Sequence, residues 1–144
     1  MASGRFEGGA HWFNLRVYYE DTDAAGIVYY ANYLKFAERA RTEALRLLGI
    51  HQSDLLRSEQ IGFVVTRCEI DFVRPATLDA RLTVETQLRE LGKARMCMHQ
   101  IIRAGDEVLA RLVVHLAALG AQQKPVRIPE TVAQALRQTF HANA

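Results

Sequence analysis

The sequence predicts a single α+β domain in which one long helix packs against a curled antiparallel sheet. Apolar residues first repeat with a helical period over one segment, and they then alternate with period two over several later segments. Short turn signals separate those later segments. With 144 residues, of which 49% are hydrophobic and 24% charged, the chain has the size and composition of one globular domain.

The first expected strand precedes residue 20. One of its faces carries Phe13, Leu15, Val17 and Tyr19. These residues alternate with Asn14, Arg16 and Tyr18. The first ten residues have no apolar centre, so they do not resemble a signal peptide. We therefore expect a flexible tail over residues 1–11, one domain over residues 12–144, and a cytoplasmic location.

A long helix is expected from about Asn32 to Gly49. Asn32 can serve as its N-cap, and Gly49 stands where a left-handed C-terminal residue belongs. One face of this helix is apolar at i, i+3, i+4 and i+7 spacing, through Tyr33, Phe36, Ala37, Ala40, Ala44, Leu47 and Leu48.

Four long strands are expected to follow the helix as a meander. Alternation covers residues 64–72, 80–89, 94–103 and 108–119, and turn signals stand at 91–93 and 104–107. A short helix should then start at Pro129, with Val132, Leu136 and Phe140 on one side. The last strand is apolar on both faces near its end, which predicts that a second subunit packs against the sheet.

Several function classes lack support in the composition. The net charge of +2 and the scattered basic residues argue against a nucleic-acid partner. No run of about 18 apolar residues could span a membrane. Cys68 and Cys97 lack CxxC spacing, and no two histidines have the spacing of a metal site, so we expect no metal. We also expect no cofactor.

The segment EDTDAAGIVYYANYLK, residues 20–35, combines two carboxylates, a turn of small residues and a helix start. Backbone N–H groups at a helix N-terminus can stabilise negative charge that develops on an oxygen. A carboxylate just upstream could then act beside that oxygen. The spacing alone leaves a second interpretation open, in which Asp21 and Asp23 only stabilise turns.

The longer segment RVYYEDTDAAGIVYYANYLKFAERARTEALRLLG, residues 16–49, resembles the acyl-CoA thioesterases of the 4-hydroxybenzoyl-CoA thioesterase family. It is most similar to the branch associated with the bacterial Tol–Pal envelope system. A looser similarity continues through FVVTRCEIDFVRPATLDARLTVET and covers most of the chain. The resemblance implies the hotdog fold, a long helix wrapped by a curved antiparallel sheet, and a homotetramer built as a dimer of dimers.

The resemblance also implies an active site. The catalytic aspartate of the family falls on Asp23, and the backbone N–H that receives the thioester oxygen falls on Tyr30. A tyrosine of the preceding strand, used in the Tol–Pal branch, falls on Tyr19. That branch commonly has histidine where this chain has Tyr30. The difference does not affect a role of the Tyr30 backbone N–H, but it argues against an acid–base role of the side chain.

The expected activity is hydrolysis of an acyl- or aroyl-CoA thioester to the free acid and coenzyme A. Asp23 would act as a nucleophile or as a general base, and the sequence leaves both open. Two other functions stay open, a hydratase or dehydratase of the same fold and a non-catalytic acyl-CoA-binding protein. The resemblance further implies an active site at a dimer interface.

Overall fold

The computed structural model describes residues 2–140, and it consists of a six-stranded antiparallel sheet, one long helix and two shorter helices. The strands are β1 (Arg5–Glu7), β2 (Ala10–Arg16), β3 (Gly62–Phe72), β4 (Arg81–Leu91), β5 (Arg95–Ala104) and β6 (Glu107–Leu119). The helices are α1 (Asn32–Leu47), α2 (Gln52–Glu59) and α3 (Glu130–Phe140), with 3₁₀ turns at Tyr19–Asp21 and Ala121–Gln123. The predicted α+β class is confirmed.

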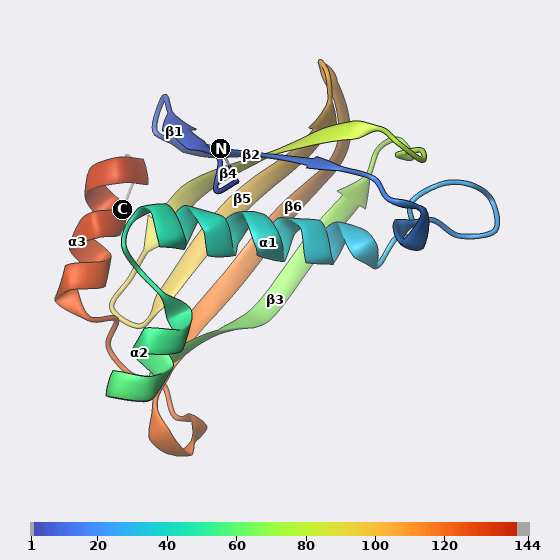
Figure 1. The fold of residues 1–144 in the computed structure, drawn as a ribbon. Coiled ribbons are helices and arrows are strands. Elements are labelled where there is room, and N and C mark those ends of the chain that lie inside the picture. The colour runs from blue at the N-terminus through green and yellow to red at the C-terminus, as the bar shows by residue number, and fades with distance from the viewer. Residues whose placement is uncertain (1, 141–144) are drawn as a thin grey trace.

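The long helix α1 lies across one face of the curved sheet (Figure 1). Its predicted apolar face is buried from Tyr33 to Ala44, while Leu47 is exposed and Leu45 takes its place in the core. Gly49 ends the helix with φ of +79°, a left-handed conformation that side chains with a Cβ rarely adopt.

The sheet order differs from the predicted meander. The strands run β1-β2-β4-β5-β6-β3, so only β4, β5 and β6 are joined as successive hairpins. Strand β3 pairs with β6, Gly62 opposite Leu119 and Phe72 opposite Ala110, and it forms one edge of the sheet. Strand β4 has β2 on one side and β5 on the other, so it cannot lie next to β3. The chain therefore crosses the sheet between β3 and β4.

The N-terminal segment also differs from the prediction. Residues 1–11 were expected to be a flexible tail, but the described part contains β1 and the start of β2, paired through Arg5 and Trp12. Phe6 packs edge-on against Phe140 of α3 at 5.0 Å between ring centroids. Contacts with the distant end of the chain therefore order a segment that has little local signal of its own.

Buried polar side chains join α1 to the centre of the sheet. Oε1 of Gln100 on β5 accepts a hydrogen bond from Nη1 of Arg41 at 2.9 Å. Nε2 of Gln100 donates to the carbonyl of Ala37 at 2.9 Å and to Oγ1 of Thr86 on β4 at 3.0 Å. Gln100 and Thr86 are fully buried and Arg41 nearly so, which fixes how α1 is placed on the sheet.

The end of β6 is buried by its own chain. Ala117 and Ala118 are both buried, and Val126 donates a backbone hydrogen bond to Ala118 at 3.0 Å. The segment after β6 thus folds back over it. The apolar end of this strand predicts a covering second subunit. In the structure, the segment after β6 covers much of that end, so the burial of β6 gives little support for an oligomer.

Candidate active site

Asp23 lies in a short hairpin between the 3₁₀ turn at Tyr19–Asp21 and helix α1. Its N–H donates to the carbonyl of Ile27 at 2.9 Å, and its carbonyl accepts from the N–H of Gly26 at 3.0 Å. Gly26 has φ of +78°, so the turn depends on a residue without a Cβ. The small residues of this stretch therefore close a tight turn beside the carboxylate, as the sequence predicts.

The Asp23 side chain is exposed, and one of its oxygens is already used. Oδ1 accepts a hydrogen bond from the N–H of Ala25 at 2.9 Å, which fixes the direction of the carboxylate. Within residues 2–140, no hydrogen-bond donor approaches Oδ2. The carboxylate thus has one oriented oxygen and one oxygen free to react.

Helix α1 begins where the sequence predicts, but its N-cap is Ala31 rather than Asn32. The N–H groups of Asn32, Tyr33 and Leu34 donate to carbonyls three residues earlier, which tightens the first turn. No backbone carbonyl of the described chain accepts from the N–H of Tyr30 or of Ala31. Two free donors therefore stand at the positive end of the helix dipole.

Asp21 has a structural place in the same segment. Its Oδ2 accepts from the N–H of Tyr18 at 2.8 Å. Its carbonyl accepts from the N–H of Tyr29 at 2.9 Å and from Nδ2 of Asn32 at 2.9 Å. The carboxylate and the carbonyl of Asp21 both take part in local turns, and the Asp21 carbonyl, unlike that of Asp23, is bonded to the first residue of α1.

The two candidate tyrosines are both exposed at the surface of the single chain. Tyr30 is 62% exposed, and its ring packs against Tyr29 at 5.0 Å and edge-on against Phe72 at 5.9 Å. Tyr19 is 83% exposed and lies in a 3₁₀ turn, because β2 ends at Arg16 instead of continuing to Tyr19. The structure thus joins Tyr30 to an aromatic cluster and leaves the Tyr19 ring outside it.

Some neighbours of the site were missed by sequence reasoning. Phe72 at the end of β3 packs against Tyr33 at 5.6 Å as well as against Tyr30. Ala76, in the segment between β3 and β4, donates its N–H to the Tyr33 hydroxyl at 3.0 Å. The proline at position 75 marked this segment as irregular but gave no indication of its partner.

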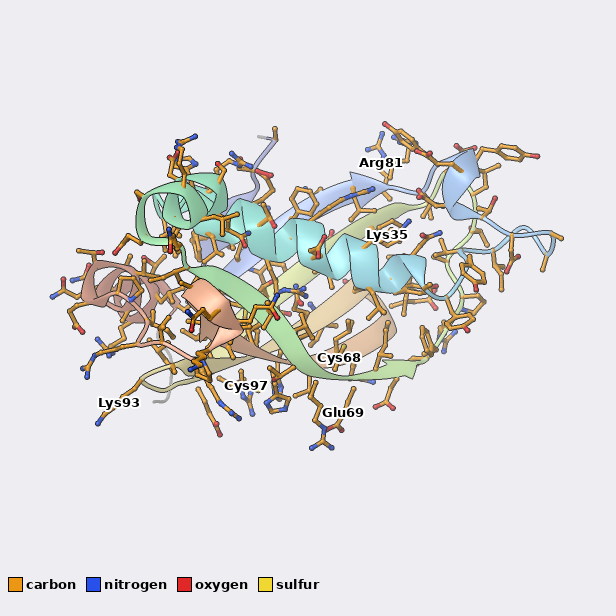
Figure 2. All side chains as sticks on the ribbon, turned by 90° about the horizontal axis from the view of Figure 1, so that it is seen from below. Lys35, Cys68, Glu69, Arg81, Lys93 and Cys97 are labelled. Carbon is orange, nitrogen blue, oxygen red and sulfur yellow. The ribbon has the colours of Figure 1, made fainter. Side chains whose placement is uncertain are left out.

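A groove of about 600 Å³ lies between α1 and β3 and is lined by Arg41, Leu45, Phe63, Val65 and Met98, among others. Strand β3 runs along the open margin of the sheet, with Cys68 and Glu69 on it (Figure 2). Val64 and Val65 are exposed there, and so are Phe72 and Val73 at the other end. One side of the groove is thus formed by an edge strand that exposes apolar residues.

Two further classes of feature were sought in residues 2–140. No three His, Cys, Asp or Glu side chains of these residues gather in a way that could hold a metal ion. None of the helices there combines the length and the apolar character that crossing a membrane requires.

A model of the thioesterase superfamily matches residues 25–111 of the chain. The match includes the start of α1, but it begins just after Asp23. The acyl-CoA thioesterase YbgC of Haemophilus influenzae is 44% identical over 121 residues, which are 83% of this chain and 89% of that protein. The acyl-CoA thioester hydrolase YbgC of Escherichia coli O6:H1 is 35% identical over 86% of this chain and 93% of its own length.

Solved structures of similar proteins have the same architecture. The crystal structure of a probable thioesterase from Bartonella henselae superposes with a TM-score of 0.80 and 41% identity, over 83% of this chain and 99% of that one. A gentisyl-coenzyme A thioesterase superposes with a TM-score of 0.79 and 28% identity, over 85% of this chain and 98% of that one.

Proposed function

Because the chain belongs to the thioesterase superfamily and is a thioester hydrolase, we propose that it cleaves an acyl- or aroyl-CoA to the free acid and coenzyme A. Its hotdog fold is shared with the solved thioesterases that it resembles. The YbgC relatives are named for acyl-CoA thioester hydrolysis, and a more distant relative of known structure for hydrolysis of gentisyl-coenzyme A. These names support coenzyme A as the thiol of the substrate, and they do not specify one acyl group.

Asp23 is the proposed catalytic carboxylate. As a nucleophile, its oxygen would attack the thioester carbon, and the C–S bond would break to release the coenzyme A thiolate and leave an acyl–aspartyl anhydride. Water would then hydrolyse the anhydride and regenerate the carboxylate. As a general base, Asp23 would instead take a proton from the water that attacks the same carbon. The oriented and partly free carboxylate is compatible with both.

The observation that carries the proposal is the pair of free amides at the start of α1. The Tyr30 N–H is proposed to receive the thioester oxygen as it becomes negative, and the Ala31 N–H can assist. Removal of one such donor in other enzymes costs about 3 kcal/mol of transition-state stabilisation. The Tyr29–Asp21 hydrogen bond of 2.9 Å keeps this helix start next to the Asp23 hairpin.

Tyr19 is proposed to contribute only in the assembled protein. Its ring is exposed in the single chain, so a contact with substrate would require a surface that covers it. Such a role fits the Tol–Pal-associated branch, and we propose that this chain belongs there. The similarity to proteins named YbgC supports that placement.

The active oligomer is proposed to be a homotetramer made of two dimers. Strand β3 is 11 residues long and exposes Val64 and Val65, and no strand among residues 2–140 pairs with its outer side. Such an edge is a template for pairing with a second strand. Two copies of β3 would join the sheets edge to edge and bring a second subunit beside the α1–β3 groove. We further propose that the Asp23 loop of one subunit lies near the sheet of the other.

Thiol release from a panel of acyl-CoAs tests the activity directly. A hydratase or a plain binding protein would release no thiol, whereas a thioesterase releases one coenzyme A per turnover. Among variants, Asp23→Asn should lower kcat by at least about a hundredfold with little change in KM, because the amide can neither attack nor accept a proton.

The matched control is Asp21→Asn. The amide oxygen of asparagine can still accept the hydrogen bond from Tyr18, so activity should stay within a few-fold of wild type. Tyr30→Phe keeps the backbone N–H and should also be mild. Full activity in Asp23→Asn would contradict the assignment of Asp23 as the catalytic carboxylate. A severe loss of activity in Tyr30→Phe would indicate that the Tyr30 hydroxyl, and not only its backbone N–H, takes part in catalysis.

A further inference from the structure

We propose that Asn32 and Tyr33, two successive residues of the first turn of α1, are positioning residues that hold the Asp23 hairpin in register with the helix start. The inference rests on the proposed function, because it concerns how Asp23 is kept beside the Tyr30 and Ala31 amides. Each side chain reaches a different end of the hairpin, and neither needs to touch the substrate.

Asn32 holds the N-terminal end of the hairpin. Its Nδ2 donates to the carbonyl of Asp21 at 2.9 Å, and the same carbonyl accepts from the N–H of Tyr29 at 2.9 Å. One carbonyl oxygen is therefore bonded to the residue just before the free amides and to the first residue of the helix. Asn32 is the first residue of the helix rather than its N-cap, and its side chain forms this link instead of a cap.

Tyr33 holds the C-terminal end through a short relay. Its hydroxyl oxygen accepts from the N–H of Ala76 at 3.0 Å, and the carbonyl of Ala76 accepts from the N–H of Val28 at 2.9 Å. Val28 in turn bridges to Thr22, and Ile27 accepts from the N–H of Asp23 at 2.9 Å. The relay thus runs from the helix, through the β3–β4 connection, into the hairpin that carries the carboxylate.

The relay is buried, so water cannot replace a lost bond. Tyr33, Ala76 and Val28 are each at most 3% exposed. The Tyr33 ring also packs against Phe36 at 6.2 Å and Phe72 at 5.6 Å between centroids. Burial raises the pKa of the Tyr33 hydroxyl, so the hydroxyl stays neutral while its oxygen accepts from Ala76.

Register between the carboxylate and the helix start matters because both groups must meet one thioester. A displacement of about 1 Å in a catalytic group can cost on the order of a hundredfold in rate. Residues 23–26 at the tip of the Asp23 hairpin are exposed, whereas Val28 at its C-terminal end is buried. The two hydrogen-bonded ends therefore supply restraint that the exposed tip lacks.

The test compares Tyr33→Phe and Asn32→Ala with Tyr18→Phe. Tyr33→Phe keeps the ring and removes the acceptor, while Asn32→Ala removes the donor and substitutes a better helix former, which limits the loss of stability. Tyr18 is exposed at the same loop, so Tyr18→Phe is the matched control. Two measurements are made. Steady-state kinetics on an acyl-CoA cleaved by wild type gives kcat and KM, and amide hydrogen exchange gives the protection of single backbone N–H groups.

We expect each positioning variant to lower kcat by about tenfold at nearly constant KM, while Tyr18→Phe changes neither. In the hydrogen-exchange measurement, Tyr33→Phe should raise the exchange rates of the Val28 and Asp23 amides by at least about tenfold. Asn32→Ala should raise the exchange rate of the Tyr29 amide by a similar factor. In an Asp23→Asn background, Tyr33→Phe should reduce the remaining rate by much less than tenfold, because the group that it positions is gone.

Unchanged exchange at Val28 and Tyr29, or an unchanged kcat in both variants, overturns the inference. A full tenfold loss in the Asp23→Asn background also overturns it, because Tyr33 would then act independently of Asp23. If Tyr33→Phe fails to fold, Asn32→Ala decides by the same criteria. A wild-type protein that cleaves no acyl-CoA refutes the proposed function instead, and the exchange measurement then decides alone whether the two side chains hold the hairpin.

Discussion

Replacement of Gln100 by methionine should be among the most destabilising single changes in the core. Methionine fills about the same volume but makes none of the three hydrogen bonds of the amide. It also leaves the buried Arg41 guanidinium without this acceptor, and burial already lowers the pKa of Arg41. Loss of the acceptor of a buried charge therefore costs more than loss of a hydrogen bond between neutral groups.

The magnitude follows from the bonds. The charged hydrogen bond from Arg41 contributes about 2 kcal/mol, and the bonds to Ala37 and Thr86 about 1 kcal/mol each, which gives about 4 kcal/mol. A chain of 144 residues unfolds with an entropy of about 0.3 kcal/mol/K. The expected fall in Tm is therefore about 13 °C, measured by calorimetry or by circular dichroism.

Two matched variants make the test specific. Gln87→Met on the neighbouring strand removes one hydrogen bond, to Glu85, at a partly exposed position, and should cost less than about 1 kcal/mol. Arg41→Met combined with Gln100→Met removes the charge together with its acceptor, so it should cost at least about 1 kcal/mol less than the sum of the single variants. A Gln100→Met loss no larger than that of Gln87→Met would refute this reasoning.

Two further predictions concern the N-terminal strands and the sheet edge. Burial lowers the pKa of His11, so between that pKa and about 6.5 the unfolded chain binds more protons than the folded one. Stability should therefore fall from pH 7.5 to pH 5 by more in wild type than in His11→Gln, whereas equal losses of Tm would contradict this. Light scattering at micromolar concentration should give the mass of a tetramer, and Val65→Lys on the β3 edge should reduce it. A monomeric mass for wild type would contradict the proposed assembly.

Helix α1 could be predicted well because its signal is local. Spacing of apolar residues determines which face is buried, and the face from Tyr33 to Ala44 is confirmed. The pairing of β3 with β6 could not be predicted, since alternation with period two gives a strand its two faces but not its neighbour. Helix α2 was missed because its eight residues contain a single buried side chain, Leu55.

The site shows the same division. The turn at Gly26 and the helix start could be predicted from residue types, and the carboxylates of Asp21 and Asp23 both accept turn hydrogen bonds, from Tyr18 and Ala25. The contact between Tyr33 and Ala76 joins residues 43 positions apart. No local pattern encodes such a contact, so the relay to the hairpin required three-dimensional coordinates.

The position of β3 at the sheet edge also affects how the chain is made. Strand β3 is complete at Phe72, but its partner β6 ends only at Leu119. At about 5–20 residues per second, a ribosome needs several seconds to add the missing length. During that interval β3 is exposed without a partner on either side, and α1 has only part of the sheet to pack against. The alternating Arg67, Glu69 and Asp71 of β3 place charges within an otherwise apolar strand, which discourages association of the nascent chain with its neighbours.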